Sequence, residues 1–251
     1  LNQKNLIFDG NGHTISAAEG KTFCFDVDGK GGEATGLEIR SLTVDGASFS
    51  AKLGGAFFVE DGTSVTFRNV TIKNSKANSG SDITGGGAIF INDHGNPPQV
   101  QIIDCVFENN TVPNAENNGF VGRGGAIYAN NFRSTSAVKL TVKDSVFRNN
   151  QAAYGGAIAA DGVVDLVVEN CTFEENSGTV GADDIYIYDG ISTGKKNLTI
   201  ASTVTATLLG NTYTNTSSDS DDMTAMNVIF GRYYPADFSG KPGVAPVGAI
   251  D

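Results

Sequence analysis

The sequence predicts an all-β solenoid, a parallel β-helix of about six coils with irregular loops. A glycine-pair phrase recurs as GGAF at Gly54 and as GGAI at Gly86, Gly124 and Gly155. A second phrase alternates with it, as FENN at Phe107, FRNN at Phe147 and FEEN at Phe173. Around both phrases lie short β-branched runs with no helical periodicity. Repeats tens of residues long are typical of stacked units that are too small to bury a core alone.

Aligning the phrases gives the register of the predicted coils. One position is shared by Val44, Ile72, Phe107, Phe147, Phe173 and Tyr213. Each unit then reads as a strand, a polar corner, a strand that ends on Asn, and a glycine-pair strand followed by a loop. Propeller blades would instead show hairpins marked by Asn-Gly or Asp-Gly turns, and these are sparse here.

Each repeated residue type has a physical role in such a coil. Glycines at corners allow close backbone approach, because they carry no Cβ; these are Gly55, Gly87, Gly125 and Gly156. The aligned aromatic residues predict a stack. The asparagines Asn110, Asn150 and Asn176 predict a ladder of stacked side-chain amides, with Ser75 and Thr216 in its place at the two ends.

The repeat predicts a single elongated domain over residues 1–236. Residues 6–16 and 35–46 are interpreted as earlier coils with less regular loops. The repeat fades after Ser217, and residues 216–236 are expected to cap the open end. The Gly/Pro-rich residues 237–251 are interpreted as a linker or tail. The start at Leu1, which leads directly into a strand-like run, indicates a mature or excised segment of a longer protein.

Composition excludes some classes of function. The 17 Lys and Arg against 28 Asp and Glu give a formal net charge of −11, which argues against a nucleic-acid partner. An acidic surface is typical of extracellular proteins and of cation binders, but plain solubility is the favoured explanation. No apolar run is long enough to span a membrane as a helix.

The cysteines are predicted to be free. Cys105 and Cys171 occupy the same aligned position, with Ser145 on the coil between them. Two coil rises, about 9.6 Å, exceed the Cα separation of a disulfide. These two thiols are therefore interpreted as small core residues. Cys24 completes an odd number of cysteines with no CxxC spacing.

Acidic residues supply the candidates for catalysis. Asp183 and Asp184 stand at a coil corner, in a degenerate glycine phrase (GADDI), and Asp161 and Asp189 lie on adjacent turns. Arg123 is the candidate base or substrate clamp for a lyase. Glycosidases need two suitably spaced carboxylates. The histidines, His13 and His94, are expected to lie too far from Asp183 to pair with it.

Two further sets of residues are candidates for binding. The D-x-D start of the loop with Asp219, Asp221 and Asp222 offers the oxygen ligands that Ca²⁺ takes, although a solvated acidic turn is the alternative. No other metal or cofactor is predicted. The irregular insertions between repeats carry the candidate ligand contacts, around Ser79, Asn117 and Phe120.

The alternation of GGAI at Gly86, Gly124 and Gly155 with FxxN at Phe107, Phe147 and Phe173 resembles the chlamydial polymorphic membrane protein family and related adhesin-like β-helix proteins. The resemblance covers roughly Gly54 to Asn176. It implies a right-handed β-helix from the passenger segment of a surface adhesin, in which repeat-containing segments bind host receptors.

Three hypotheses follow. The first is a non-catalytic, secreted or cell-surface module of a larger adhesin, which presents loops and a lateral face to a host-surface protein or glycan. The second is a polysaccharide lyase or glycoside hydrolase of the pectate-lyase-like β-helix class. The third is a structural spacer of a large surface protein. The repeat residues specify the fold, and the fold alone does not choose among these functions.

Overall fold

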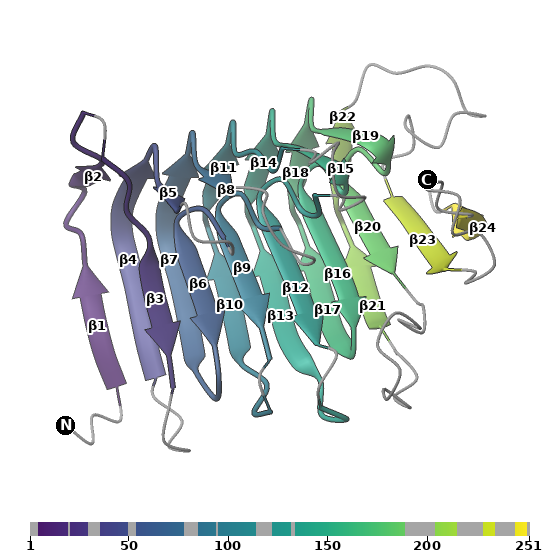
Figure 1. The fold of residues 1–251 in the computed structure, drawn as a ribbon, viewed down its shortest axis with the longest axis horizontal. Coiled ribbons are helices and arrows are strands. Elements are labelled where there is room, and N and C mark those ends of the chain that lie inside the picture. Colours follow the sequence, from purple (N-terminus) through teal and green to yellow (C-terminus); the bar gives the residue numbers. More distant parts are fainter. Residues whose placement is uncertain are drawn as a thin grey trace.

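The computed structural model describes residues 5–19, 21–29, 36–49, 54–77, 85–93, 95–113, 122–131, 134–188, 204–214, 228–233 and 244–249. These residues form a rod of β-coils stacked along one axis, with β1 at one end and β23 and β24 at the other (Figure 1). Every helix-or-strand element among them is a strand. The predicted all-β parallel solenoid is therefore confirmed.

Two faces of the rod belong to one 12-stranded sheet. The first face contains β1 (Asn5–Asp9), β10 (Gln99–Ile103), β13 (Val138–Lys143), β17 (Val164–Glu169) and β21 (Val204–Leu209). The second contains β2 (Thr14–Ser16), β11 (Val106–Glu108), β14 (Val146–Arg148), β18 (Thr172–Glu174) and β22 (Thr212–Thr214). The longer strands β4 (Gly36–Asp45) and β7 (Ser64–Lys73) run through both faces.

The third face is an eight-stranded sheet. Its strands are β3 (Phe25–Asp28), β6 (Phe57–Glu60), β9 (Ile89–Asn92), β12 (Ile127–Asn131), β16 (Ile158–Gly162), β20 (Ile185–Tyr188), β23 (Val228–Tyr233) and β24 (Val244–Ala249). Between the second and third faces, β5 (Ser48–Phe49) pairs with β8 (Lys76–Ala77), and β15 (Gln151–Tyr154) pairs with β19 (Ser177–Gly181).

Neighbouring coils pair in parallel and in the predicted register. Val44 pairs with Ile72, Ile72 with Phe107, and the pairing continues through Phe147 and Phe173 to Tyr213. Along the first face the rungs are β1, β4, β7, β10, β13, β17 and β21, which is one rung more than the predicted six or so.

Two corners of each coil turn on residues with positive φ. The corner between the first and second faces uses Ser41, Asn69, Asp104, Asp144, Asn170 and Gly210, with φ between 49° and 66°. The corner that follows the second face uses Gly46, Asn74, Asn109, Asn149 and Glu175. Asn and Asp tolerate this left-handed conformation better than other side chains do, which explains the polar residues after each apolar run.

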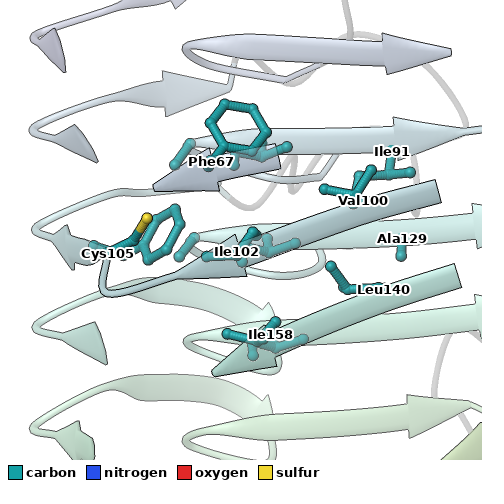
Figure 2. Packing of buried hydrophobic residues seen from close by; sticks show 14 of the residues in the cluster. Phe67, Ile91, Val100, Ile102, Cys105, Ala129, Leu140 and Ile158 are labelled. Carbon is teal, nitrogen blue, oxygen red and sulfur yellow. The ribbon is translucent and has the colours of Figure 1, made fainter. Parts of the chain in front are cut away.

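The hydrophobic core fills the space enclosed by the three faces. Alternate residues of each strand point inward, as the period of a strand requires. Phe67, Ile102, Leu140 and Ile158 are fully buried in it and come from four different strands (Figure 2). Cys105 and Cys171 belong to the same core as free thiols. Burial raises the pKa of both thiols to about 11, so they stay protonated at neutral pH.

A ladder of side-chain amides runs inside the second corner. Asn110 Nδ2 donates to Asn150 Oδ1 (3.0 Å), and Asn150 Nδ2 donates to Asn176 Oδ1 (2.9 Å). Each Nδ2 also donates to a core carbonyl, and the Oδ1 atoms accept backbone N–H groups of the preceding rung. At one end the Ser75 N–H donates to Asn110 Oδ1. The ladder therefore satisfies polar groups that no water can reach.

An aromatic stack stands beside the ladder. The rings of Phe107, Phe147, Phe173 and Tyr213 lie parallel, with successive centroids 4.8, 5.0 and 5.2 Å apart. This spacing matches the rise between paired strands, so the residues of one aligned position stack without adjustment. Offset aromatic pairs add to the free energy of burial.

The second glycine of each pair is required by close contact between coils. A Cβ on Gly55 would collide with the carbonyl oxygen of Gly87, one on Gly87 with that of Gly125, and one on Gly125 with that of Gly156. The first glycine of each pair has positive φ instead. The GG phrase thus combines one conformational and one steric requirement.

The C-terminal region contains strands where the sequence predicted a cap and a tail. Residues 228–233 form β23, which pairs in parallel with β20. Residues 244–249, within the predicted tail, form β24, which pairs antiparallel with β23. Backbone pairing at the exposed edge of the last parallel rung explains why a Gly/Pro-rich segment takes strand form there. Residues 237–243 lie outside the described residues.

We predict that Asn150→Ala lowers the free energy of unfolding by about 2–4 kcal/mol, because it removes the buried hydrogen bonds that Asn150 makes with the Phe107 carbonyl, the Asn110 backbone N–H and the Asn110 side-chain amide. The measurement is chemical denaturation followed by circular dichroism. The matched control is Gln151→Ala, since Gln151 is the next residue and its side chain is exposed. Equal denaturation midpoints for the two variants would contradict the structural role of the ladder.

Candidate functional site

A second apolar cluster lies on the outer side of the third face. It consists of Phe90, Tyr128, Ala153, Tyr154, Ala159, Ala182 and Tyr186, and we call it the corner cluster. In β12, Ile127 and Ala129 face the core, so Tyr128 between them faces the opposite way. The rings of Phe58, Phe90 and Tyr128 stack along three successive rungs, and Tyr154 packs on Tyr186.

The corner cluster encloses an ion pair between two sequence-predicted residues. Nη1 of Arg123 lies 3.2 Å from Oδ2 of Asp161. The Tyr128 hydroxyl donates to the same Oδ2 (3.1 Å) and accepts from Nη1 of Arg123 (3.3 Å). The guanidinium also lies over the Tyr128 ring, with Cζ 5.9 Å from the centroid. These contacts join the coil that contains Arg123 and Tyr128 to the next coil, which contains Asp161.

Burial dominates the electrostatics of this group. Asp161 is 1% exposed, whereas the Arg123 side chain is 25% exposed. Burial raises the pKa of Asp161 to about 6, although Arg123 and the Tyr128 hydroxyl act in the opposite direction. Burial also raises the pKa of Tyr128, and the Asp161 charge raises it further. Desolvation of the carboxylate therefore outweighs its attraction to the guanidinium.

Asn130 and Asp161 bring unsatisfied polar atoms into the same place. They are register partners on β12 and β16, and both are 1% exposed. Both amide atoms of Asn130 and Oδ1 of Asp161 are buried without a hydrogen-bond partner. Buried polar atoms without short hydrogen bonds are rare; the Gly162 backbone N–H and the Tyr128 hydroxyl are the polar groups that act on Asp161 and Asn130, respectively.

Asp183 and Asp184 are engaged elsewhere in the fold. Asp184 is fully buried, and its Oδ1 accepts from Asn176 Nδ2 (2.8 Å), which continues the amide ladder by one step. Oδ1 of Asp183 accepts from the Gly178 N–H (3.0 Å). Their backbones replace the glycine phrase of the preceding coil, since the Asp184 carbonyl pairs with Ala157 and Ile158. These hydrogen bonds of the two carboxylates thus go to Asn176 and Gly178 and not to the Arg123–Asp161 pair.

Several predicted residues lie outside the described part of the chain. These are the binding-loop residues Ser79, Asn117 and Phe120, the calcium candidates Asp219, Asp221 and Asp222, and also Asp189, Thr216 and His94. Within the described residues, no group of three or more His, Cys, Asp or Glu side chains is arranged to hold a metal ion. No helix in that part of the chain is long and apolar enough to cross a membrane.

Sequence reasoning did not single out Tyr128 or Asn130. Tyr128 directly follows the GGAI phrase at Gly124, and Asn130 lies two residues further on the same face of the strand. The sequence did contain a signal for them: a polar side chain stands at each of the two outward positions that follow the GGAI phrase. The corner cluster could not be anticipated, because the repeat places these side chains on the outer side of the coil and does not indicate what covers them.

Between the described strands, the coils differ in length at two places, one of which adjoins the corner cluster. Thr111 pairs with Gln151 and Arg123 pairs with Tyr154, so residues 112–122 of one coil correspond to Ala152 and Ala153 of the next. Lys76 pairs with Thr111 and Gly85 with Arg123, so residues 77–84 are the equivalent segment one coil earlier. We call this place the insertion rim. The other place lies between the third and first faces.

Comparison with known proteins agrees with this architecture. Residues 54–221 match the family described as "Right handed beta helix region". The chain belongs to the right-handed β-helix family. The match spans the coils that carry the amide ladder, the glycine pairs and Arg123, Tyr128 and Asp161. No curated protein and no solved structure gives a significant match to the chain.

Membership of the right-handed β-helix family thus accounts for the coil and its repeat residues. The buried ionic group at the insertion rim is a feature of this chain's own side chains.

We predict a specific pH dependence of stability from Asp161. Its pKa is about 6 in the folded protein and 3.8 when unperturbed. Between these values the folded state holds a proton that the unfolded state has released, so this group's contribution to stability falls as pH rises from about 4 to 6. Urea denaturation of the wild type and of Asp161→Asn at pH 4.5 and 7.5 measures it.

The wild type should lose roughly 2 kcal/mol relative to Asp161→Asn across this interval. Other carboxyl groups titrate equally in both proteins, and the comparison therefore cancels them. A stability difference between the two proteins that is the same at both pH values would contradict the raised pKa.

Proposed function

We propose that this protein is a non-catalytic, secreted or cell-surface β-helix module of a larger adhesin. It presents the insertion rim and the adjoining lateral face to a host-surface protein or glycan. The resemblance of the GGAI and FxxN phrases to the chlamydial polymorphic membrane protein family supports this assignment. The observation that carries it is the side-by-side placement, at one rim, of the residues where the insertions begin and end.

The placement follows from the register. Successive coils are paired at Lys76, Thr111 and Gln151 before the rim, and at Gly85, Arg123 and Tyr154 after it. Insertions in neighbouring coils consequently start and end one rung apart, about 4.8 Å. The segments that differ in sequence between coils are therefore attached next to one another on the rigid β-helix. Proteins commonly build binding surfaces from loops held by such a scaffold.

The repeat residues themselves offer little to a ligand. Phe107, Asn110 and their equivalents in the next two coils are buried and bonded to one another. Binding must therefore use the insertions and the outward side chains of the faces.

We predict that removing the longer insertion abolishes binding and preserves the fold. Deleting residues 113–121 leaves Thr111–Val112–Gly122–Arg123–Gly124, which matches Gln151–Ala152–Ala153–Tyr154–Gly155 of the next coil one for one. Binding to a glycan array and to cultured animal cells should fall by about tenfold or more. The denaturation midpoint should stay within a few tenths of a molar of the wild type, because the next coil makes this connection without an insertion.

The matched control is deletion of residues 78–83 at the same rim, one coil earlier. Loss of binding in only one of the two deletions locates the contact. Unchanged binding in both would refute the adhesion proposal and favour a structural spacer.

The Arg123–Asp161 pair favours enzymatic action as the second candidate. A carboxyl group with a raised pKa beside a guanidinium is typical of acid–base chemistry on polysaccharides. Its burial weighs against this role, since a substrate must reach the carboxyl group.

We predict no turnover of neutral or acidic polysaccharides by the wild-type protein. Reducing-end and unsaturated-product assays check this on a polysaccharide panel. Turnover that Asp161→Asn abolishes, while Asp184→Asn leaves it intact, would establish the enzymatic alternative.

A further inference from the structure

Arg123 stands where the longer insertion of the rim rejoins the coil. Its backbone bridges to Gly85 on the coil before and to Tyr154 on the coil after. Its carbonyl oxygen accepts the Gly86 N–H (3.0 Å), and the N–H of the next residue, Gly124, donates to the Tyr154 carbonyl oxygen (2.9 Å). The backbone at the end of the insertion is therefore paired with both neighbouring coils.

The side chain of Arg123 adds a second connection to the following coil. Its Nη1 lies 3.2 Å from Oδ2 of Asp161, which belongs to that coil, and 3.3 Å from the Tyr128 hydroxyl oxygen. The guanidinium also lies over the Tyr128 ring. Asp161 is 1% exposed, so a ligand on the surface cannot touch it. The side chain thus ties the end of the insertion to a buried group one coil further on.

The neighbouring coils place other residues at the position of Arg123. In the coil before, this residue is Gly85, and a Cβ there would lie 2.2 Å from Cδ1 of Tyr128 and 2.6 Å from the Arg123 carbonyl oxygen. In the coil after, which has no insertion, it is Tyr154, whose ring packs on Tyr186. Of these three coils, the one with the longer insertion carries the ion pair, and the coil before it leaves room for it.

An ion pair in this setting fixes geometry more than it adds stability. Desolvation of two charges offsets much of their attraction, and apolar replacements of buried ion pairs are often neutral in stability. The planar guanidinium of Arg123 is held by an oxygen atom from each of two coils and by an aromatic face. This combination leaves the side chain few alternative positions.

We propose that Arg123 is a positioning residue of the binding surface and acts through Asp161 on the next coil. The ion pair holds the end of the insertion in one arrangement before a ligand arrives. Less of the binding free energy is then spent on ordering the segment. This inference rests on the proposed function, because it concerns the same surface.

The first experiment needs no ligand and uses the whole chain. In native-state hydrogen exchange followed by NMR, the N–H groups of Gly86 and Gly124 should exchange faster in Arg123→Met, by about tenfold. Arg123→Lys keeps a cation at this place and should restore most of the protection. The reference for global unfolding is the N–H of Val146, which pairs with the preceding coil on the second face. Unchanged exchange at the two glycines, or an equal increase at Val146, would overturn the proposal.

The second experiment separates positioning from direct contact with a ligand. Binding to a glycan array and to cultured animal cells is compared for the wild type, Arg123→Met and Asp161→Asn, under conditions in which all three keep the same circular dichroism spectrum. Asp161→Asn should weaken binding by about tenfold although its side chain is buried. The matched control is Glu108→Gln, which removes the Arg148–Glu108 ion pair of the same length (3.2 Å) and should leave binding unchanged.

The outcomes distinguish this inference from the function on which it rests. Wild-type affinity in Asp161→Asn would overturn the positioning role of Arg123 and leave the adhesion proposal intact. Failure of the wild type to bind either the array or the cells would refute both.

Discussion

The structure depends on one constraint, the parallel pairing of each coil with the next in a fixed register. The strands of a single coil do not pair with one another, and a single coil encloses no complete core, so its stability comes from its neighbours. The constraint is strict because a slip of one residue would turn every inward side chain outward. The amide ladder of Asn110, Asn150 and Asn176 enforces it, since each amide is satisfied only when the next one stands at the same position.

The same constraint decides where the chain tolerates variation. The corner between the first and second faces and the one after the second face are each closed by single residues with positive φ, and the ladder and aromatic stack lie directly inside. An insertion there would break both. The glycine-pair corner forbids even a Cβ, because carbonyl oxygens of the next rung lie against Gly87 and Gly125. Insertions are left to the other connections, and register then sets their ends side by side.

The insertion rim shows how a scaffold can acquire chemistry of its own. Tyr128, Asn130 and Asp161 occupy outward positions that elsewhere on the rod face solvent, yet the corner cluster removes them from water. Desolvation then shifts the pKa of Asp161 and leaves buried polar atoms without short hydrogen bonds. None of these residues stabilises the coil in the way that the repeat residues do. Their arrangement adds a buried ion pair at the base of the segment proposed to bind a ligand.

The sequence by itself determined the repeating unit, because its residues interact with their own equivalents. The alignment of Phe107 with Phe147, the separation of Cys105 from Cys171 and the interior position of Asn110 all follow from periodicity. The sequence also named Arg123 and Asp161, but in one group with Asp183 and Asp184, which bond elsewhere. Only the tertiary structure decided that Asp161 faces Arg123 in a dry corner, and that Asp184 continues the ladder. Contacts between unlike residues on different rungs depend on how each corner bends and on what covers it, and no period in the sequence encodes either.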